Sequence, residues 1–151
     1  RRNPRPPKEP IFNRLMLERT LLAALAMGLI AFGLFYSLLE AGYSEAAARN
    51  ELLLLMVLFE NVHIGNSRSE TKSAFLLSPL RSPVLVFGAI FATSVHIAAM
   101  YLPLGQAVLG VEPVDLTLWG TTLLLALSIL PIMELHKLYW NALSKKQTAT
   151  D

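Results

Sequence analysis

A short polar cluster interrupts an apolar stretch near the middle of this 151-residue sequence. Glu60, Asn61 and His63 follow directly after the apolar run 52–59. An ionisable side chain in such surroundings is costly in a membrane and usually faces a partner or a cavity inside a helix bundle. Glu60 is therefore the candidate ligand for a cation or a proton, with Asn61 and His63 as candidate accessory residues. We expect its side chain to point into the bundle.

Two other interpretations of the cluster stay open at this point. Glu60 could be a structural carboxyl, hydrogen-bonded to Asn61, His63 or a neighbouring helix. Glu60 and His63 also resemble the Glu-x-x-His pairs of carboxylate metal sites in helix bundles, but those sites need several such ligands. His96 has no acidic neighbour in its apolar segment, and the sequence contains no cysteine, so we expect no complete metal site in this chain.

The elements that position these residues follow from composition. The sequence is 54% hydrophobic and 16% charged, whereas an average soluble domain has about 25% charged residues. Four segments, 21–39, 46–66, 83–102 and 114–133, come close to the roughly 20 apolar residues that cross a bilayer as a helix. A soluble four-helix bundle would need polar faces, and segment 21–39 has almost none. The sequence therefore predicts an all-α, integral multi-pass membrane protein with four transmembrane helices.

The basic residues predict the orientation of these helices. Twelve of the 13 lysines and arginines lie before residue 20, in the connection 67–82 or after residue 134, and the connections 40–51 and 103–117 hold only Arg49. Basic residues gather on the cytoplasmic side, so both termini should be cytoplasmic. This predicts a basic, proline-rich cytoplasmic arm at 1–19, a membrane domain at 20–134 and a cytoplasmic tail at 135–151. The net charge of +2 does not indicate a nucleic-acid partner.

Other polar and small residues have simple interpretations at this point. Arg49 and Glu51 should lie near the outer end of the second span, where their side chains can reach water. Glu134 and Lys137 should form an ordinary surface pair, and Pro131 should bend the last span. Small residues four positions apart should allow close helix packing; these pairs are Ala24 with Gly28, Gly33 with Ser37, and Gly88 with Ala92.

Several short motifs occur in the order found in one known family. They are PRPPKEPIF at 4–12, LFENVH at 58–63 followed by NSRSE at 66–70, YLP at 101–103 with VEP at 111–113 and LTLW at 116–119, and SILP at 128–131. Together they resemble the C-terminal membrane domain, spans seven to ten, of P-type cation-transporting ATPases of the calcium-pump type. The resemblance covers almost the whole chain.

The resemblance implies a role for the chain and for one residue. In reticulum-type calcium pumps the eighth span supplies one acidic ion ligand, and Glu60 occupies the matching position. The chain would then be a membrane support domain of an ATP-driven cation pump, with calcium as the first choice of ion and Mg-ATP used by the full-length pump. Its partners would be membrane lipid, spans one to six and the cytoplasmic domains.

The departures from the family limit what the chain can do alone. The sequence has no Asp-Lys-Thr-Gly-Thr, Thr-Gly-Glu or Gly-Asp-Gly motif, so we expect no ATPase activity from this chain by itself. One carboxylate also cannot supply the six to eight oxygens that calcium needs. The alternative function is a free-standing four-helix membrane scaffold or assembly subunit without transport activity. Coding sequence upstream of Arg1 that contains a phosphorylation motif would distinguish the pump from the scaffold.

The predicted topology can be tested with single cysteines at Ser44 and Ser69. An impermeant thiol reagent applied from outside should label the Ser44 variant and leave the Ser69 variant protected, because the connection 40–51 is outside and 67–82 is cytoplasmic. The opposite labelling pattern would overturn the predicted orientation.

Overall fold

The computed structural model of the chain describes residues 13–69, 72–76, 78 and 82–148, with side chains up to residue 143. Every regular element within these ranges is a helix, which confirms the predicted all-α class. In chain order the elements are α1 (Arg14–Glu40), α2 (Glu45–Ser67), the short 3-10 helix η1 (Ala74–Leu76), α3 (Pro83–Tyr101), α4 (Pro103–Leu109), α5 (Leu116–Leu127) and α6 (Ile129–Thr148).

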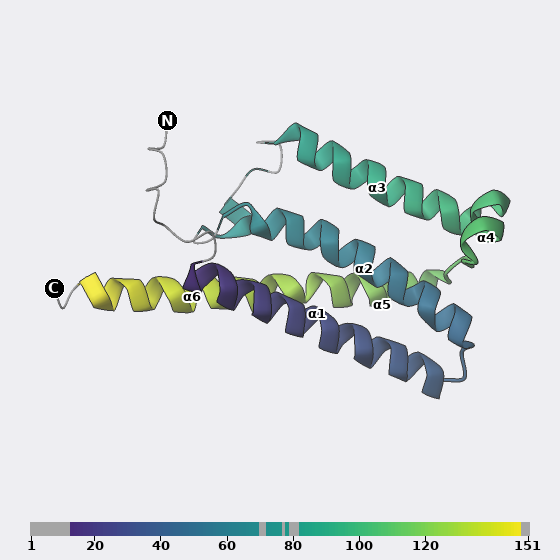
Figure 1. The fold of residues 1–151 in the computed structure, drawn as a ribbon, viewed down its shortest axis with the longest axis horizontal. Coiled ribbons are helices and arrows are strands. Elements are labelled where there is room, and N and C mark those ends of the chain that lie inside the picture. The colour runs from purple at the N-terminus through teal and green to yellow at the C-terminus, as the bar shows by residue number, and fades with distance from the viewer. Residues whose placement is uncertain (1–12, 70–71, 77, 79–81, 149–151) are drawn as a thin grey trace.

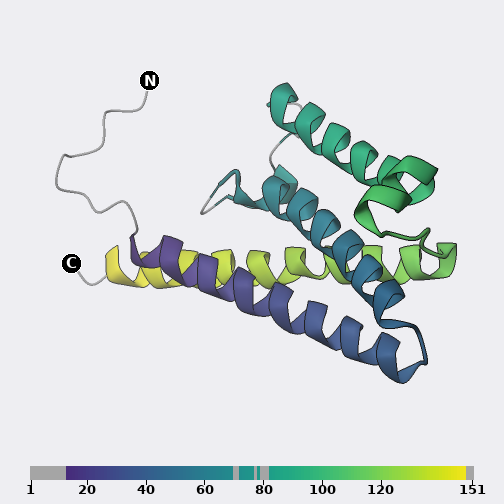
Figure 2. The same ribbon diagram turned by 45° about the vertical axis from the view of Figure 1, so that its right-hand side comes forward.

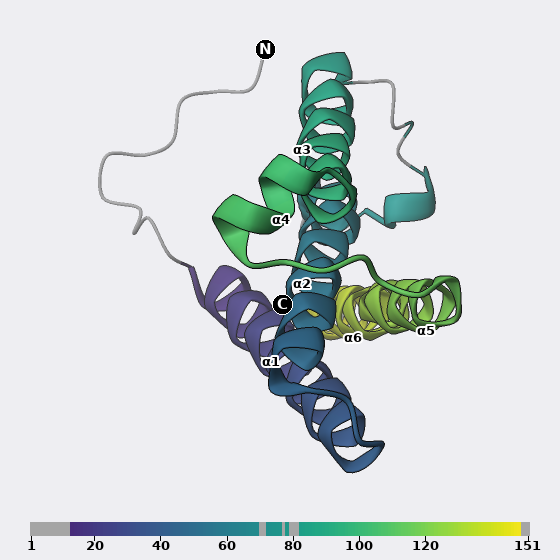
Figure 3. The ribbon, with the colours of Figure 1, turned by 90° about the vertical axis from the view of Figure 1, so that its right-hand side faces the viewer.

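Helix α2 is the centre of the arrangement and contacts α1, α3, α5 and α6. The long helices run side by side in alternating directions (Figure 1), and a view turned by 45° shows the same order (Figure 2). Seen along the helices, α2 lies between α3 on one side and α1 with α5 and α6 on the other (Figure 3). The start of α1 and the end of α6 lie at the same end of the molecule (Figure 1).

Polar caps and glycines set the ends of the helices. The side chains of Asn13 and Ser44 accept hydrogen bonds from the backbone N–H groups of Met16 and Ala47, at 2.7 and 3.1 Å, and so satisfy free donors at the starts of α1 and α2. Gly110 ends α4 with φ of 62°, a left-handed conformation that suits glycine. These local features help the chain to reverse direction between its apolar segments.

Three stretches of the described residues are long and apolar enough to cross a membrane. They are Arg14–Glu40, Pro83–Tyr101 and Leu116–Leu143, the last of which combines α5 with most of α6. Helix α2, which corresponds to the second of the four predicted spans, does not reach the same apolar content, because polar residues occur at both of its ends and around Glu60. Its apolar residues nevertheless form the middle of the core, where Leu54, Leu55 and Phe59 are at most 1% exposed.

The predicted domain boundaries differ from the observed helices. Helix α1 begins at Arg14, so residues 14–19 are not an extended arm but its first turns; residues 1–12 lie outside the described part. Helix α6 continues to Thr148, well into the predicted tail. The predicted connection 103–117 contains α4, which folds back so closely on α3 that a Cβ on Gly105 would overlap the backbone of Ala99. The first two differences arise because α1 begins before its apolar run starts and α6 continues after its apolar run ends.

The last span is interrupted where a proline was predicted to bend it. Helical structure breaks at Ser128 between α5 and α6, three residues before Pro131. Proline has no N–H to donate to the carbonyl four residues earlier, which weakens the helix at this point. The two helices nevertheless continue along one line (Figures 1 and 2), so the break deflects the chain only slightly.

The predicted packing through small residues is wrong for this set of helices. A Cβ built on Gly28, Gly33 or Gly88 would have no atom of another helix within 4 Å. Helix α1 instead packs through the neighbouring positions Ala23 and Ala31, which are 4% and 8% exposed. Sequence spacing alone shows that two small residues share a face, but not which face meets a neighbour.

Replacing Gly28 tests this assignment of faces. Gly28→Leu should not lower the free energy of unfolding of the chain, and it should gain up to about 0.8 kcal/mol from helix propensity. Ala48→Leu, at a position that is 0% exposed, is the matched control and should lose about 1 to 3 kcal/mol through overpacking. Thermal unfolding of the purified chain in detergent measures both. A large loss with Gly28→Leu would show that this face is packed.

Candidate functional site

Helix α2 carries the predicted site residues, but they point in different directions. Glu60 is exposed, and no hydrogen bond to it occurs among the described residues. The expectation that its side chain points into the bundle of these four helices is therefore wrong. Leu53 and Met56, 50% and 43% exposed, precede it by seven and four residues and form one outward-facing stripe with it. Phe59 and Leu55 occupy the buried side.

Asn61 and His63 lie on faces of α2 that meet other helices. The amide nitrogen Nδ2 of Asn61 donates to Oγ1 of Thr93 on α3 at 2.6 Å. His63 is half-buried, and its Nδ1 is buried without a hydrogen-bond partner. The three predicted site residues therefore do not converge on one point within this chain. Within the described ranges no three histidine, aspartate or glutamate side chains come together as a metal ion would require.

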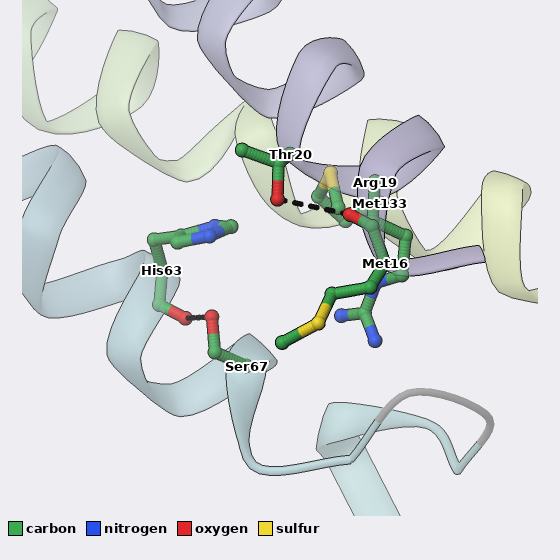
Figure 4. Close-up of a pocket in the computed structure, with 6 residues that line it drawn as sticks. All are labelled: Met16, Arg19, Thr20, His63, Ser67 and Met133. Atoms are coloured by element: carbon green, nitrogen blue, oxygen red, sulfur yellow. Dashed lines mark hydrogen bonds between the residues drawn. The ribbon is translucent and has the colours of Figure 1, made fainter. Parts of the chain in front are cut away.

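His63 lines a cavity of about 150 Å³ between the start of α1, the last turns of α2 and α6. Figure 4 shows the imidazole facing the side chains of Thr20 and Met16 across this space. Ser67 donates its hydroxyl proton to the carbonyl of His63 at 2.8 Å, and Thr20 donates to the carbonyl of Met16 at 2.9 Å. The cavity is completed by Arg19 and Met133. Its polar lining therefore comes from both α1 and α2.

Sequence reasoning missed a buried carboxyl on the same helix. Glu51 is 1% exposed and is hydrogen-bonded to the hydroxyl of Thr122 on α5. The prediction that its side chain reaches water at the end of the span is therefore wrong. Asn50, beside it, donates to the backbone carbonyl of Glu112. The available signal was Thr122 itself, a polar residue in the interior of an apolar helix.

A second missed cluster lies at the opposite end of α2. Lys137 is 2% exposed, and its ammonium group donates to Oδ1 of Asn66 at 2.6 Å and to Glu134 at 2.8 Å. Glu134 also accepts from the backbone N–H of Ala74 at 3.0 Å. Glu134 and Lys137 do form a pair, but the prediction that the pair lies on the surface is wrong. Lys137 neutralises Glu134 inside a junction between α2, η1 and α6. A cation at a helix C-terminus also interacts favourably with the helix dipole.

These features define a class of protein. Long helices with outward apolar faces, and polar side chains collected along one central helix, describe the membrane domain of an integral membrane protein. The sequence pattern of the family described as "Cation transporting ATPase, C-terminus" matches residues 1–139. The chain belongs to this family.

Individual relatives agree with the family assignment. The chain is 30% identical over 118 residues to the "Probable cation-transporting ATPase F" of Mycobacterium tuberculosis, a match that covers 78% of this chain and 13% of the relative. It is 27% identical over 114 residues to a "Calcium-transporting ATPase" of Plasmodium falciparum, covering 76% of this chain and 9% of the relative. An "Endoplasmic reticulum calcium ATPase" of Aspergillus fumigatus is 26% identical over 85 residues, 56% of this chain and 9% of the relative.

The junction around Lys137 can be tested by one substitution. Lys137→Met should destabilise the chain by about 2 kcal/mol, because buried hydrogen bonds to a charged group are lost and Glu134 keeps an uncompensated charge. Lys72→Met removes an exposed lysine and should change the stability by less than about 0.5 kcal/mol. Equal effects of the two substitutions in denaturant unfolding would show that the junction does not stabilise the fold.

Proposed function

We propose that the chain is the C-terminal membrane domain of an ATP-driven cation pump of the P-type class, with calcium as the proposed ion. Family membership supports the pump, and two relatives are named as calcium-transporting. The chain spans only 13% or less of the relatives it matches, so ATP hydrolysis belongs to regions outside it. The chain itself contains no phosphorylation motif.

In this proposal α2 crosses the membrane as the second of four spans, and both ends of the chain are cytoplasmic. Its 23 residues extend roughly 34 Å at 1.5 Å per residue, enough for a hydrocarbon core of about 30 Å. Its polar side chains are no obstacle, because Asn50, Glu51 and Asn61 each have a partner on a neighbouring segment. The distribution of basic residues supports the orientation.

The observation that carries the proposal is the outward position of Glu60. Glu60 lies seven residues before the end of α2, which is roughly 10 Å along the helix axis. A carboxylate at this depth would not be left facing lipid, so its partner belongs to a part of the pump outside this chain. We propose that Glu60 supplies one carboxylate to a cation site whose other ligands come from the preceding spans.

The proposed site is consistent with the chemistry of calcium. Calcium takes six to eight oxygen ligands, which one carboxylate cannot provide. The side chain of Asn61 is already hydrogen-bonded to Thr93, and the side chain of His63 lines the cavity beside α1 and α6. In the assembled pump these two residues would therefore position α2, while Glu60 would contact the ion.

The test is Glu60→Gln in the full-length pump, with Glu51→Gln as the matched control on the same helix. Removing the charge of Glu60 should weaken cation affinity by about tenfold or more, equivalent to about 1.4 kcal/mol. Glu51 is buried against α5 and should not contact the ion, so Glu51→Gln should leave the affinity unchanged. Cation-dependent phosphorylation measures the affinity of both variants.

The outcome that contradicts this assignment is equally clear. Transport with unchanged cation affinity in Glu60→Gln would make Glu60 a structural residue. Loss of expression or of ATP binding in that variant is not expected, because glutamine has nearly the shape of glutamate. Reduced affinity in both variants would show that substitution anywhere on α2 disturbs the site.

A further inference from the structure

Glu51 is buried in the contact between α2 and α5. Its side chain is 1% exposed, and Leu54 and Leu55, one turn further along α2, are 0% exposed. On the facing helix α5, Thr122 and Ala126 are also 0% exposed. An ionised carboxylate in such surroundings needs a counter-charge, because its solvation by water is lost.

No counter-charge to Glu51 occurs among the described residues. Arg49, the basic residue nearest in sequence, has a side chain that is 64% exposed and lies 4.0 Å from Glu45. On α6 the charged pair Glu134 and Lys137 lies at the other end of α2, in the junction with Asn66.

The other charged groups near this end of the bundle are acidic and exposed. They are Glu40 at the end of α1, Glu112 before α5 and Asp115 at its N-cap. They would disfavour a further negative charge.

The hydrogen bonds of Thr122 leave room for a proton on Glu51, because the hydroxyl lies within reach of two acceptor oxygens but has only one proton to donate. Its Oγ1 lies 2.8 Å from the carbonyl oxygen of Leu118, which can only accept, and it is also hydrogen-bonded to Oε1 of Glu51. A hydroxyl group has one proton to donate and lone pairs to accept. If the proton of Thr122 goes to Leu118, the second hydrogen bond requires a proton on Glu51. The remaining oxygen of Glu51, Oε2, has no hydrogen-bond partner among the described residues, as expected for an oxygen that carries no charge.

We propose that Glu51 is a proton-binding site within the contact between α2 and α5. Its carboxyl group retains a proton at neutral pH and donates it to Thr122. This site is separate from Glu60, which lies on another face of α2 and is exposed. Loss of the proton would leave a buried charge, so deprotonation of Glu51 and separation of α2 from α5 are linked. The proposal rests on burial and hydrogen bonding and does not depend on the ion ligand assigned above.

Infrared spectroscopy of the complete chain in bilayers at neutral pH tests the protonation state. The C=O stretching band of protonated carboxylic acids should be present in the wild type and should lose one component in Glu51→Gln. Glu60→Gln should retain that component, whatever Glu60 itself contributes to the band. Thr122→Val should shift this band to higher frequency because the hydrogen bond is lost, whereas Thr122→Ser should leave it in place. These threonine variants keep the test valid if Glu51→Gln does not fold.

Stability measured against pH gives a second, independent readout. The folded state holds a proton that the unfolded chain releases above its ordinary glutamate range, so wild-type stability should fall relative to Glu51→Gln as the pH rises from about 5 to 8. Parallel stability curves for the two proteins, or a carboxylate band that disappears in Glu51→Gln, would overturn the proposal.

Discussion

The fold depends on one constraint: the polar groups of α2 must find partners on neighbouring helices. Four polar residues of α2 form hydrogen bonds to other parts of the chain. The partners are the segment before α5 for Asn50, Thr122 for Glu51, Thr93 for Asn61 and Lys137 for Asn66. Within a bilayer there is little hydrophobic force between helices, because lipid is as apolar as leucine, and packing and polar contacts select the arrangement. These contacts join α2 to α3, α5 and α6 and fix the depth at which each helix lies beside it.

The two faces of α2 serve different purposes. The inner face makes polar contacts with other helices of the chain, and its leucines and Phe59 form the common core. The outer face carries Glu60 and has no partner among the described helices. In the proposed pump, this outer face would be the side of α2 that meets the preceding spans.

The sequence predicted the helices better than it predicted their faces. The apolar runs 46–66 and 83–102 located the starts of α2 and α3 within a few residues. Such local signals do not show which way a side chain points. They therefore could not predict the inward position of Glu51, the outward position of Glu60 or the burial of Lys137. Helices such as α1 and α3 are apolar on nearly every side, so no periodic pattern marks the packed face. That face is decided by contacts between residues far apart in the chain.

Those distant contacts have a consequence for how the protein is made. Glu51 is separated from Thr122, and Asn66 from Lys137, by 71 residues of sequence. A ribosome finishes α2 well before it has produced either partner. Until α5 and α6 arrive, the polar side chains at both ends of α2 must remain near water or be shielded by the insertion machinery. Helix α2 is therefore the second of this chain's spans to be synthesised but can take its final place only after α5 and α6 have been made, so assembly of this domain cannot proceed strictly in chain order.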